Sequence, residues 1–221
     1  MANTIKTNKN DFIELEFTGI VKETGQIFDT NVKNQAKKLD LNIDEKKIKP
    51  LIICIGQNMV PSAFDKALEE KEINKHYKIE LSPEEAFGKR DPSLVKLIPL
   101  SAFTEKNIQP QPGMTFALDT TLVKILSVSG GRVLADFNNP LAGKDIIYEF
   151  KIKRKITELK EKINALMDFF LKRRFEFETN EKEKKILVQA PKEFEPLINL
   201  AKKRFKDILD MDIILKKKKL K

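Results

Sequence analysis

The sequence predicts an α+β protein in which an antiparallel sheet packs on a short helix, a small all-β domain is inserted into that unit, and an αββαβ domain follows. Three observations predict this fold class. Segments that alternate apolar and polar residues flank one short helical segment, a second group of strand-like segments interrupts them, and the last third of the 221 residues changes to helical spacing. We therefore expect three domains: residues 1–88 with 137–154, residues 89–136, and residues 155–221.

The first predicted strand covers residues 11–18, DFIELEFT. Ile13, Leu15 and Phe17 fall on one face and glutamates on the other, a period of two that is typical of a half-buried strand. The dipeptide TG that follows indicates a turn before the returning strand. The returning strand is predicted at residues 26–30, and further strands of this sheet at 76–81 and 146–152, the last with the same alternation. PLIICIG at 50–56 is predicted as a strand that is apolar on both faces.

One short helix is predicted after the strand PLIICIG. Ser62, with Asp65 three residues later, resembles a capping box and therefore predicts the beginning of a helix. Phe64, Ala67 and Leu68 give this helix one apolar face, which we expect to pack on the sheet.

The inserted domain is predicted from four strand-like segments at residues 94–99, 114–118, 122–128 and 132–137. Between the last two, the SGG at 129–131 is a hairpin turn whose glycines can adopt positive φ. The polar GKRDP stretch at 88–92 is suited to the exposed loop at which an inserted domain leaves its host.

The last third combines two amphipathic helices with three strands. A hairpin is predicted from RFEFET and KILVQA around the polar NEKEK, and MDIIL is a final strand. The apolar helical positions are Ile156, Leu159, Ile163, Leu166, Met167, Phe170 and Leu171 in the first helix, and Leu197, Leu200, Ala201, Phe205, Ile208 and Leu209 in the second. Because so small a unit buries its apolar surface inefficiently and has sheet edges to cover, we expect a homodimer through residues 155–221, with the lysine tail outside the contact.

The composition excludes several classes of protein. No apolar run reaches the length of a membrane span and the first residues contain no apolar signal segment, so we expect a cytoplasmic protein without a membrane partner. One cysteine cannot form an internal disulfide, and one histidine cannot build a histidine-based metal site, so no metal or cofactor is expected. Cys54 is expected to be an inert buried thiol, and His76 a surface residue.

The formal net charge of +9 raises the alternative of an RNA- or ribosome-associated protein. The excess is local, because residues 1–154 contain 23 Lys/Arg and 21 Asp/Glu whereas residues 155–221 contain 19 and 12. The chain lacks the clustered aromatic motif of a nucleic-acid reader. A nucleic-acid partner is therefore not expected.

Several segments together resemble one family. They are EFTG at 16–19, FDT at 28–30, IGQNMVPSAFDKAL at 55–68, SPEEAFGKRDPSLVKLIPLSAF at 82–103 and FNNPLAGKDIIYEFKI at 137–152. They resemble the FKBP-type peptidyl-prolyl cis/trans isomerases, specifically the SlyD-like branch in which an insert-in-flap domain interrupts the FKBP fold. The αββαβ domain resembles the extra domain of the long archaeal members.

The resemblance implies an apolar substrate pocket. Carried over position by position, its lining is Phe17, Phe28, Asp29, Val60, Phe64, Phe87 and Tyr148. Among several departures from the common pattern, two bear directly on this pocket. Phe87 replaces a tyrosine whose hydroxyl bonds a substrate carbonyl, and Pro61 has no backbone N–H to offer a ligand.

Such a pocket requires neither a nucleophile nor a metal. Amide resonance imposes a rotational barrier of roughly 18–20 kcal/mol, and X-Pro bonds exchange over tens to hundreds of seconds. The twisted transition state has less charge separation than the planar amide, so an aromatic cup binds it preferentially. Asp29 is expected to be the one charge at the rim of this pocket.

We therefore expect a peptidyl-prolyl isomerase and folding chaperone whose partners are unfolded or nascent polypeptides containing X-Pro bonds. The insert segment LVKLI is apolar at nearly every position, so some of Leu94, Val95, Leu97 and Ile98 must face outward and are expected to bind unfolded chain. The alternative is a peptide-binding chaperone that isomerises weakly because Phe87 lacks a hydroxyl.

Overall fold

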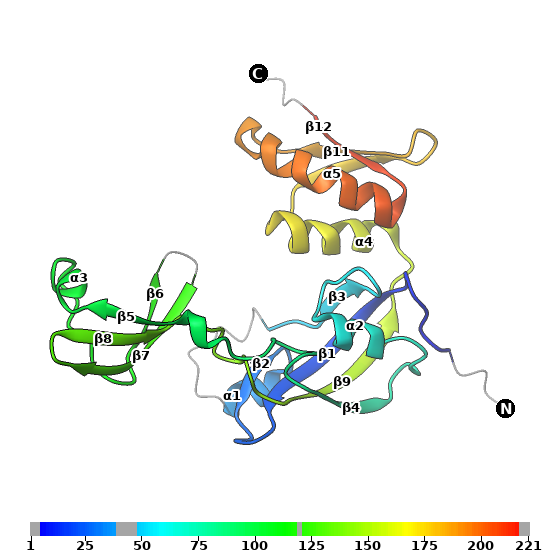
Figure 1. Ribbon diagram of the computed structural model, residues 1–221. Coiled ribbons are helices and arrows are strands. Elements are labelled where there is room, and N and C mark those ends of the chain that lie inside the picture. The colour runs from blue at the N-terminus through cyan, green and yellow to red at the C-terminus, as the bar shows by residue number, and fades with distance from the viewer. Residues whose placement is uncertain (1–4, 39–47, 119–120, 217–221) are drawn as a thin grey trace. The chain divides into compact units, whose positions relative to one another are not determined.

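The computed structural model describes residues 5–38, 48–118 and 121–216 (Figure 1). These residues form two compact units. One comprises Met1–Gly19, Ile27–Ile79 and Tyr148–Lys221, and the other comprises Ile20–Gln26 and Glu80–Ile147. Among the described helices, none is both long and apolar enough to cross a membrane.

The central sheet confirms the predicted α+β class and all five of its predicted strands. Their order is β2-β1-β9-β4, with β3 paired to β1. The strands are β1 (Phe12–Val21), β2 (Ile27–Thr30), β3 (Leu51–Cys54), β4 (His76–Leu81) and β9 (Ile146–Lys155). Alternation determines the buried face, because Ile13 and Leu15 are fully buried whereas the glutamates between and after them are half-buried. A short helix that was not predicted, α1 (Lys33–Lys38), follows β2; the rest of that Lys-rich loop, residues 39–47, lies outside the described residues.

The predicted helix is α2 (Ser62–Ala67), and Phe64 and Leu68 bury completely. The expected capping box is wrong. Pro61 is the N-cap residue, and no side chain caps the helix. The Asp65 carboxylate instead accepts the backbone N–H groups of Gly56 and Asn58, at 2.9 and 2.8 Å. Asp65 has the sequence spacing of a capping box, but its carboxylate accepts hydrogen bonds from the loop before the helix and not from the first turn of the helix.

The insert is a four-stranded sheet of order β5-β8-β7-β6. Its strands are β5 (Val95–Pro99), β6 (Thr115–Leu118), β7 (Thr121–Ser129) and β8 (Arg132–Asp136). Gly130 and Gly131 both have positive φ, which confirms the predicted hairpin. One face carries the core of Phe103, Val123, Ile125, Val133 and Ala135, in which Phe103 comes from an additional helix, α3 (Ser101–Thr104).

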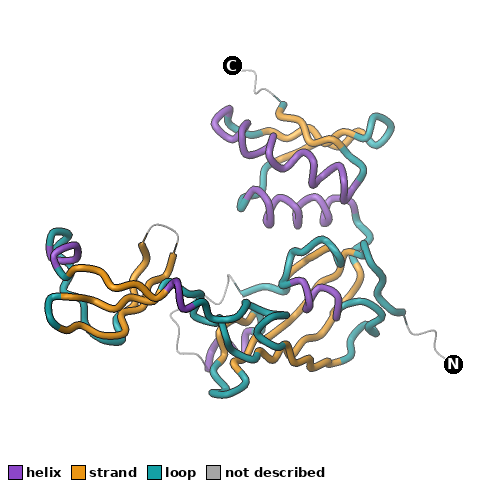
Figure 2. The backbone as a smooth tube through the Cα atoms, viewed as in Figure 1, coloured by secondary structure: helices purple, strands orange, loops and turns teal. Residues whose placement is uncertain are grey.

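The C-terminal αββαβ order is confirmed: α4 (Leu159–Leu166), β10 (Glu176–Asn180), β11 (Lys185–Gln189), α5 (Glu195–Leu209) and β12 (Asp212–Leu215). Both helices lie on the same side of the sheet (Figure 2). The sheet order is β10-β11-β12, so the last strand lies at an edge, parallel to β11. The lysine tail at 217–221 lies outside the described residues.

Two details of these helices differ from the prediction. The first helix was expected over 156–171, but α4 begins at Leu159 and continues into a π-helical turn at Met167–Leu171. Ile156 lies before the helix, and its N–H donates to the Phe12 carbonyl oxygen. In α5, Leu200 was placed on the apolar face but is 79% exposed, whereas Ile198 is buried. Because 3.6-residue periodicity leaves the boundary of an apolar face undefined by about one residue, packing decides which neighbour is covered.

Candidate active site

An aromatic cluster lies between α2 and the central sheet. The Phe64 ring stacks on Tyr148 with ring centres 4.2 Å apart and planes 9° from parallel. Phe17 packs edge-on against both rings, at 6.0 and 6.1 Å, and Phe28 packs edge-on against Tyr148 at 6.0 Å. Four of the residues that the sequence assigned to the pocket, from three strands and one helix, are therefore in contact.

Close backbone approach explains why β1 has a glycine at position 19. A Cβ atom at Gly19 would lie 2.4 Å from Cζ of Phe28, far inside van der Waals contact. The missing side chain therefore lets the Phe28 ring lie over β1. Gly19 determines the position of one wall of the cluster, a role that the EFTG motif alone did not reveal.

The strand carrying Phe17 is fixed by the amide side chain of Asn31. The Phe17 N–H donates to Asn31 Oδ1 at 2.7 Å, and Asn31 Nδ2 donates to the Leu15 carbonyl oxygen at 2.8 Å. Beyond the end of β2, the Asn31 side-chain amide thus makes with β1 the two hydrogen bonds that a neighbouring strand would otherwise make. Nearby, the hydroxyls of Thr18 and Thr30 share a hydrogen bond of 2.9 Å.

The loop that carries Val60 is fixed by Asp65. Gly56 and Asn58, whose N–H groups Asp65 accepts, both have positive φ. A buried carboxylate with two backbone donors at about 2.9 Å is a strong constraint on such a loop. Val60 is half-buried directly before Pro61 and α2. Asp65 therefore positions this loop and does not cap the helix.

Asp29 is the exposed member of the predicted set. Desolvation of its carboxyl group raises the pKa above the ordinary value of 3.8, although a backbone hydrogen bond from Thr30 opposes the shift. Burial, and then the charge of Asp29, raises the pKa of the Tyr148 hydroxyl. The Asp29 carboxylate thus lies close enough to the aromatic cluster to act on it electrostatically.

The remaining predicted residues are placed less directly. Phe87 is half-buried in the turn that follows β4 and belongs to the second unit. Phe150, which the prediction omitted, packs edge-on against Phe64 with ring centres 5.3 Å apart. The alternation Tyr148–Phe150–Ile152 along β9 could have identified it.

Cys54 is buried as expected, and burial raises the pKa of its thiol to about 12.

In the insert, the four predicted binding residues lie on or next to the edge strand β5. Leu97 is 56% exposed and Leu94 36%, whereas Val95 is half-buried. Ile98 is half-buried and packs against the insert core. The prediction that some of these residues face outward is confirmed for Leu94 and Leu97.

The fold is of the α+β class, with an aromatic cluster between the central sheet and one short helix. The chain belongs to the FKBP-type peptidyl-prolyl cis-trans isomerase family, whose model matches residues 3–118, just over half of the sequence. A second model, described as FKBP26, IF domain, matches residues 96–141.

Two relatives that are similar to this chain are also named peptidyl-prolyl cis-trans isomerases. The chain is 28% identical over 153 residues to a short-type peptidyl-prolyl cis-trans isomerase of Methanocaldococcus jannaschii, covering 69% of this chain and 95% of the relative. It is 28% identical over 130 residues to the FKBP-type isomerase SlyD of Helicobacter pylori, covering 57% and 68%. The protein is thus an FKBP-type peptidyl-prolyl cis-trans isomerase, similar in sequence to SlyD.

Proposed function

We propose that the aromatic cluster of Phe17, Phe28, Phe64 and Tyr148, with Val60, Phe87 and the charge of Asp29, isomerises X-Pro bonds in unfolded polypeptides that the insert binds. The contact of four aromatic rings from four separate elements is the observation that carries the catalytic part of this proposal. The rings exclude water and favour the twisted, less dipolar amide over the planar one.

Exposed apolar side chains support the binding role of the insert. Among the described residues, seven large apolar side chains are exposed, and five of them lie between Leu94 and Leu122. They are Leu94, Leu97, Met114, Leu118 and Leu122. A small domain that concentrates such side chains is suited to binding other apolar chain, because their burial against a client releases water. Both β5 and β6 are edges to which a client could add a strand.

The role of Asp29 is tested by the pH dependence of tetrapeptide isomerisation. We expect kcat/KM of the wild type to fall on acidification with a midpoint above 3.8, because the pKa of Asp29 is raised. Asp29→Asn is expected to be roughly tenfold slower, about 1.4 kcal/mol of transition-state stabilisation, and to show no such midpoint. A profile shared by both proteins would exclude Asp29 from the site.

Protonation of Asp29 does not itself favour unfolding in that pH window. A carboxyl group whose pKa is higher in the folded than in the unfolded state binds its proton more readily when folded, so protonation of Asp29 adds stability as the pH falls towards 3.8. Circular dichroism over the same range serves as the control. The tetrapeptide rate also separates this proposal from the alternative of a catalytically weak chaperone.

We further propose a homodimer through the C-terminal domain. Among the described residues, β10 and β12 each have β11 as their only strand partner, and Leu200 on α5 is exposed. Symmetric pairing would cover an edge and this side chain. We expect light scattering at micromolar concentration to give twice the chain mass, and a chain ending at residue 157 to be monomeric. A monomeric mass for the full chain would contradict this expectation.

A further inference from the structure

A cavity of about 350 Å³ lies where the open face of the insert sheet meets the return segment 138–144. Three cations, two leucines and one carboxylate are among its lining residues: Arg90, Lys124, Lys144, Leu122, Leu126 and Asp136. All of them belong to the second unit. This face is opposite to the insert core, whose strand residues alternate with these on β7 and β8.

Strand register places the charges side by side. Lys124 of β7 is directly opposite Asp136 of β8, so their side chains lie on the same face of the sheet. Leu122 precedes Lys124 by two residues, which puts it on that face as well, and it is 45% exposed. The exposed Leu122 and Lys124 thus lie two residues apart on the same face of β7, beside the cavity.

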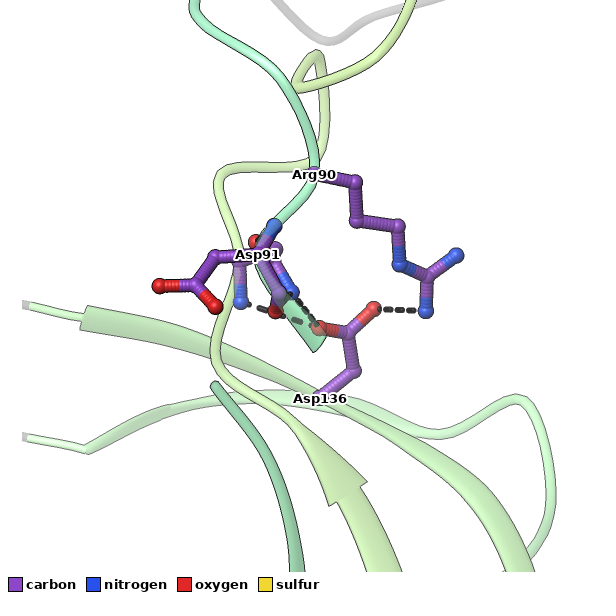
Figure 3. A network of polar contacts seen from close by, with 4 residues as sticks. Arg90, Asp91 and Asp136 are labelled. Carbon is purple, nitrogen blue, oxygen red and sulfur yellow. Dashed lines mark hydrogen bonds and ion pairs between the residues drawn. The ribbon is translucent and has the colours of Figure 1, made fainter. Parts of the chain in front are cut away.

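Asp136 is the one carboxylate of the cavity lining, and three donors already surround it (Figure 3). Arg90 Nη2 lies 2.6 Å from its Oδ2, and the backbone N and Nδ2 of Asn138 donate to its Oδ1 at 3.0 and 2.7 Å. The Asn138 amide also holds the Asp91 backbone, through hydrogen bonds of 2.8 and 2.9 Å. The hydrogen bonds of the Asp136 carboxylate thus join the segment that enters the insert, at Arg90, to the segment that leaves it, at Asn138.

The ionisable residues that line the cavity carry a net positive charge. Burial opposes ionisation of Asp136, but the hydrogen bonds from Asn138 and the charges of Arg90 and Lys124 hold its pKa below the ordinary value. With one carboxylate among three cations, the lining retains positive charge. Neither Lys124 nor Lys144 has a salt bridge within the described part of the chain that would neutralise this charge.

We propose that this cavity binds an acidic side chain of the unfolded client while a neighbouring aliphatic client side chain covers Leu122 and Leu126. The inference rests on the proposed chaperone role of the insert and specifies its substrate class. In an extended chain, residues two apart point to the same side, the same spacing that separates Leu122 from Lys124. Segments with a Leu-x-Glu pattern therefore match the site in both shape and charge.

Two proline-free peptides of the same length test the preference, one repeating Leu-x-Glu and the other Leu-x-Gln. Their affinities for the full chain are measured by fluorescence anisotropy at low and high salt. We expect the glutamate peptide to bind about fivefold more tightly at low salt, and the difference to vanish in about 0.5 M salt, where charges are screened within a few ångströms.

Lys124→Gln and Lys106→Gln form a matched pair, because each lowers the net charge of the chain by one. Lys106 lies on the opposite face of the insert, beside Phe103 and Phe116. Lys124→Gln is expected to reduce the glutamate preference to about twofold or less, and Lys106→Gln to leave it unchanged. Equal reduction by both variants would mean that net charge alone produces the preference and would overturn the site.

The two levels of the proposal fail differently. Equal binding of both peptides to the wild type overturns the acidic preference and leaves the insert as a general apolar binder. Absence of binding by both peptides, together with full aggregation suppression by a chain without the insert, overturns the proposed client surface and this site with it.

Discussion

A chain in which a short Gly-Ser loop replaces residues 92–137 is expected to isomerise a tetrapeptide within about twofold of the wild-type rate and to lose its suppression of aggregation. The cluster of Phe17, Phe28, Phe64 and Tyr148 is made entirely by the first unit, which the deletion leaves intact. The deletion removes Leu94, Leu97, Met114, Leu118 and Leu122, the exposed apolar side chains on which client binding is proposed to depend.

The cutting points follow from the hydrogen bonds at the base of the insert. Asp91 and Asn138 are paired through the Asn138 amide, and the Gly143 N–H donates to the Gly88 carbonyl oxygen at 2.8 Å. Joining residue 91 to residue 138 keeps both contacts, whereas cutting at 89 and 136 would leave the Asn138 amide without Asp91. An unsatisfied amide of this kind costs about 1–3 kcal/mol when buried.

Refolding of a protein limited by proline isomerisation provides the second readout. A client held on the insert meets the isomerase site at an effective concentration in the millimolar range, so the deletion should slow catalysed refolding roughly tenfold or more. As a control with the insert retained, Leu97→Ser with Leu122→Ser should preserve the fold, because the two side chains are 56% and 45% exposed, and should weaken suppression. Suppression that survives the deletion would place the client surface elsewhere.

Gly19→Ala is expected to reduce tetrapeptide kcat/KM by roughly tenfold to 100-fold, because displacement of a site group by about 1 Å has effects of this size. The added Cβ would lie 2.4 Å from Cζ of Phe28, so the ring must move away from β1 and from Tyr148, against which it packs. Overpacking of this kind also lowers the free energy of unfolding by about 1–3 kcal/mol. Both quantities are therefore measured.

Gly25→Ala is the matched control. Gly25 has φ of 69°, and no atom lies within 4 Å of a Cβ built on it. This substitution strains the backbone and lowers stability by about 1 kcal/mol, but it displaces no ring. We expect nearly full activity for Gly25→Ala. If Gly19→Ala were equally active, the Phe28 ring would not belong to the catalytic site.

A third variant separates the two effects of Gly19→Ala. Adding Phe28→Leu should recover stability, because the smaller side chain leaves room for the new methyl group, whereas activity should stay low without the ring. Recovery of activity together with stability would show that the loss came from strain alone.

Local sequence pattern determined much of this protein. The period of two in β1 and β9 specifies which side chains face the helix, and the glycine pair at 130–131 specifies the insert hairpin. Helical spacing identified α4 and α5 to within a few residues. In each case the relevant interactions lie within a few residues along the chain, so the order of residues is enough to predict them.

Resemblance to a family contributed what pattern alone could not. Phe17, Phe28, Phe64 and Tyr148 are ordinary core residues by composition, and only their co-occurrence with Asp29 and the AFG motif pointed to one site. The structure brings their four rings into contact. Phe150 lies in the matched segment 137–152 but was not among the positions carried over to the pocket.

The tertiary structure alone decided which partners the polar groups take. Asp65 has the spacing of a capping residue, yet it binds Gly56 and Asn58, because the positive φ values of that loop turn their N–H groups towards it. Asn31 pairs with β1 some 14 residues away, and Asp136 with Arg90 across 46. Such partners depend on how distant segments pack, and no local period encodes them.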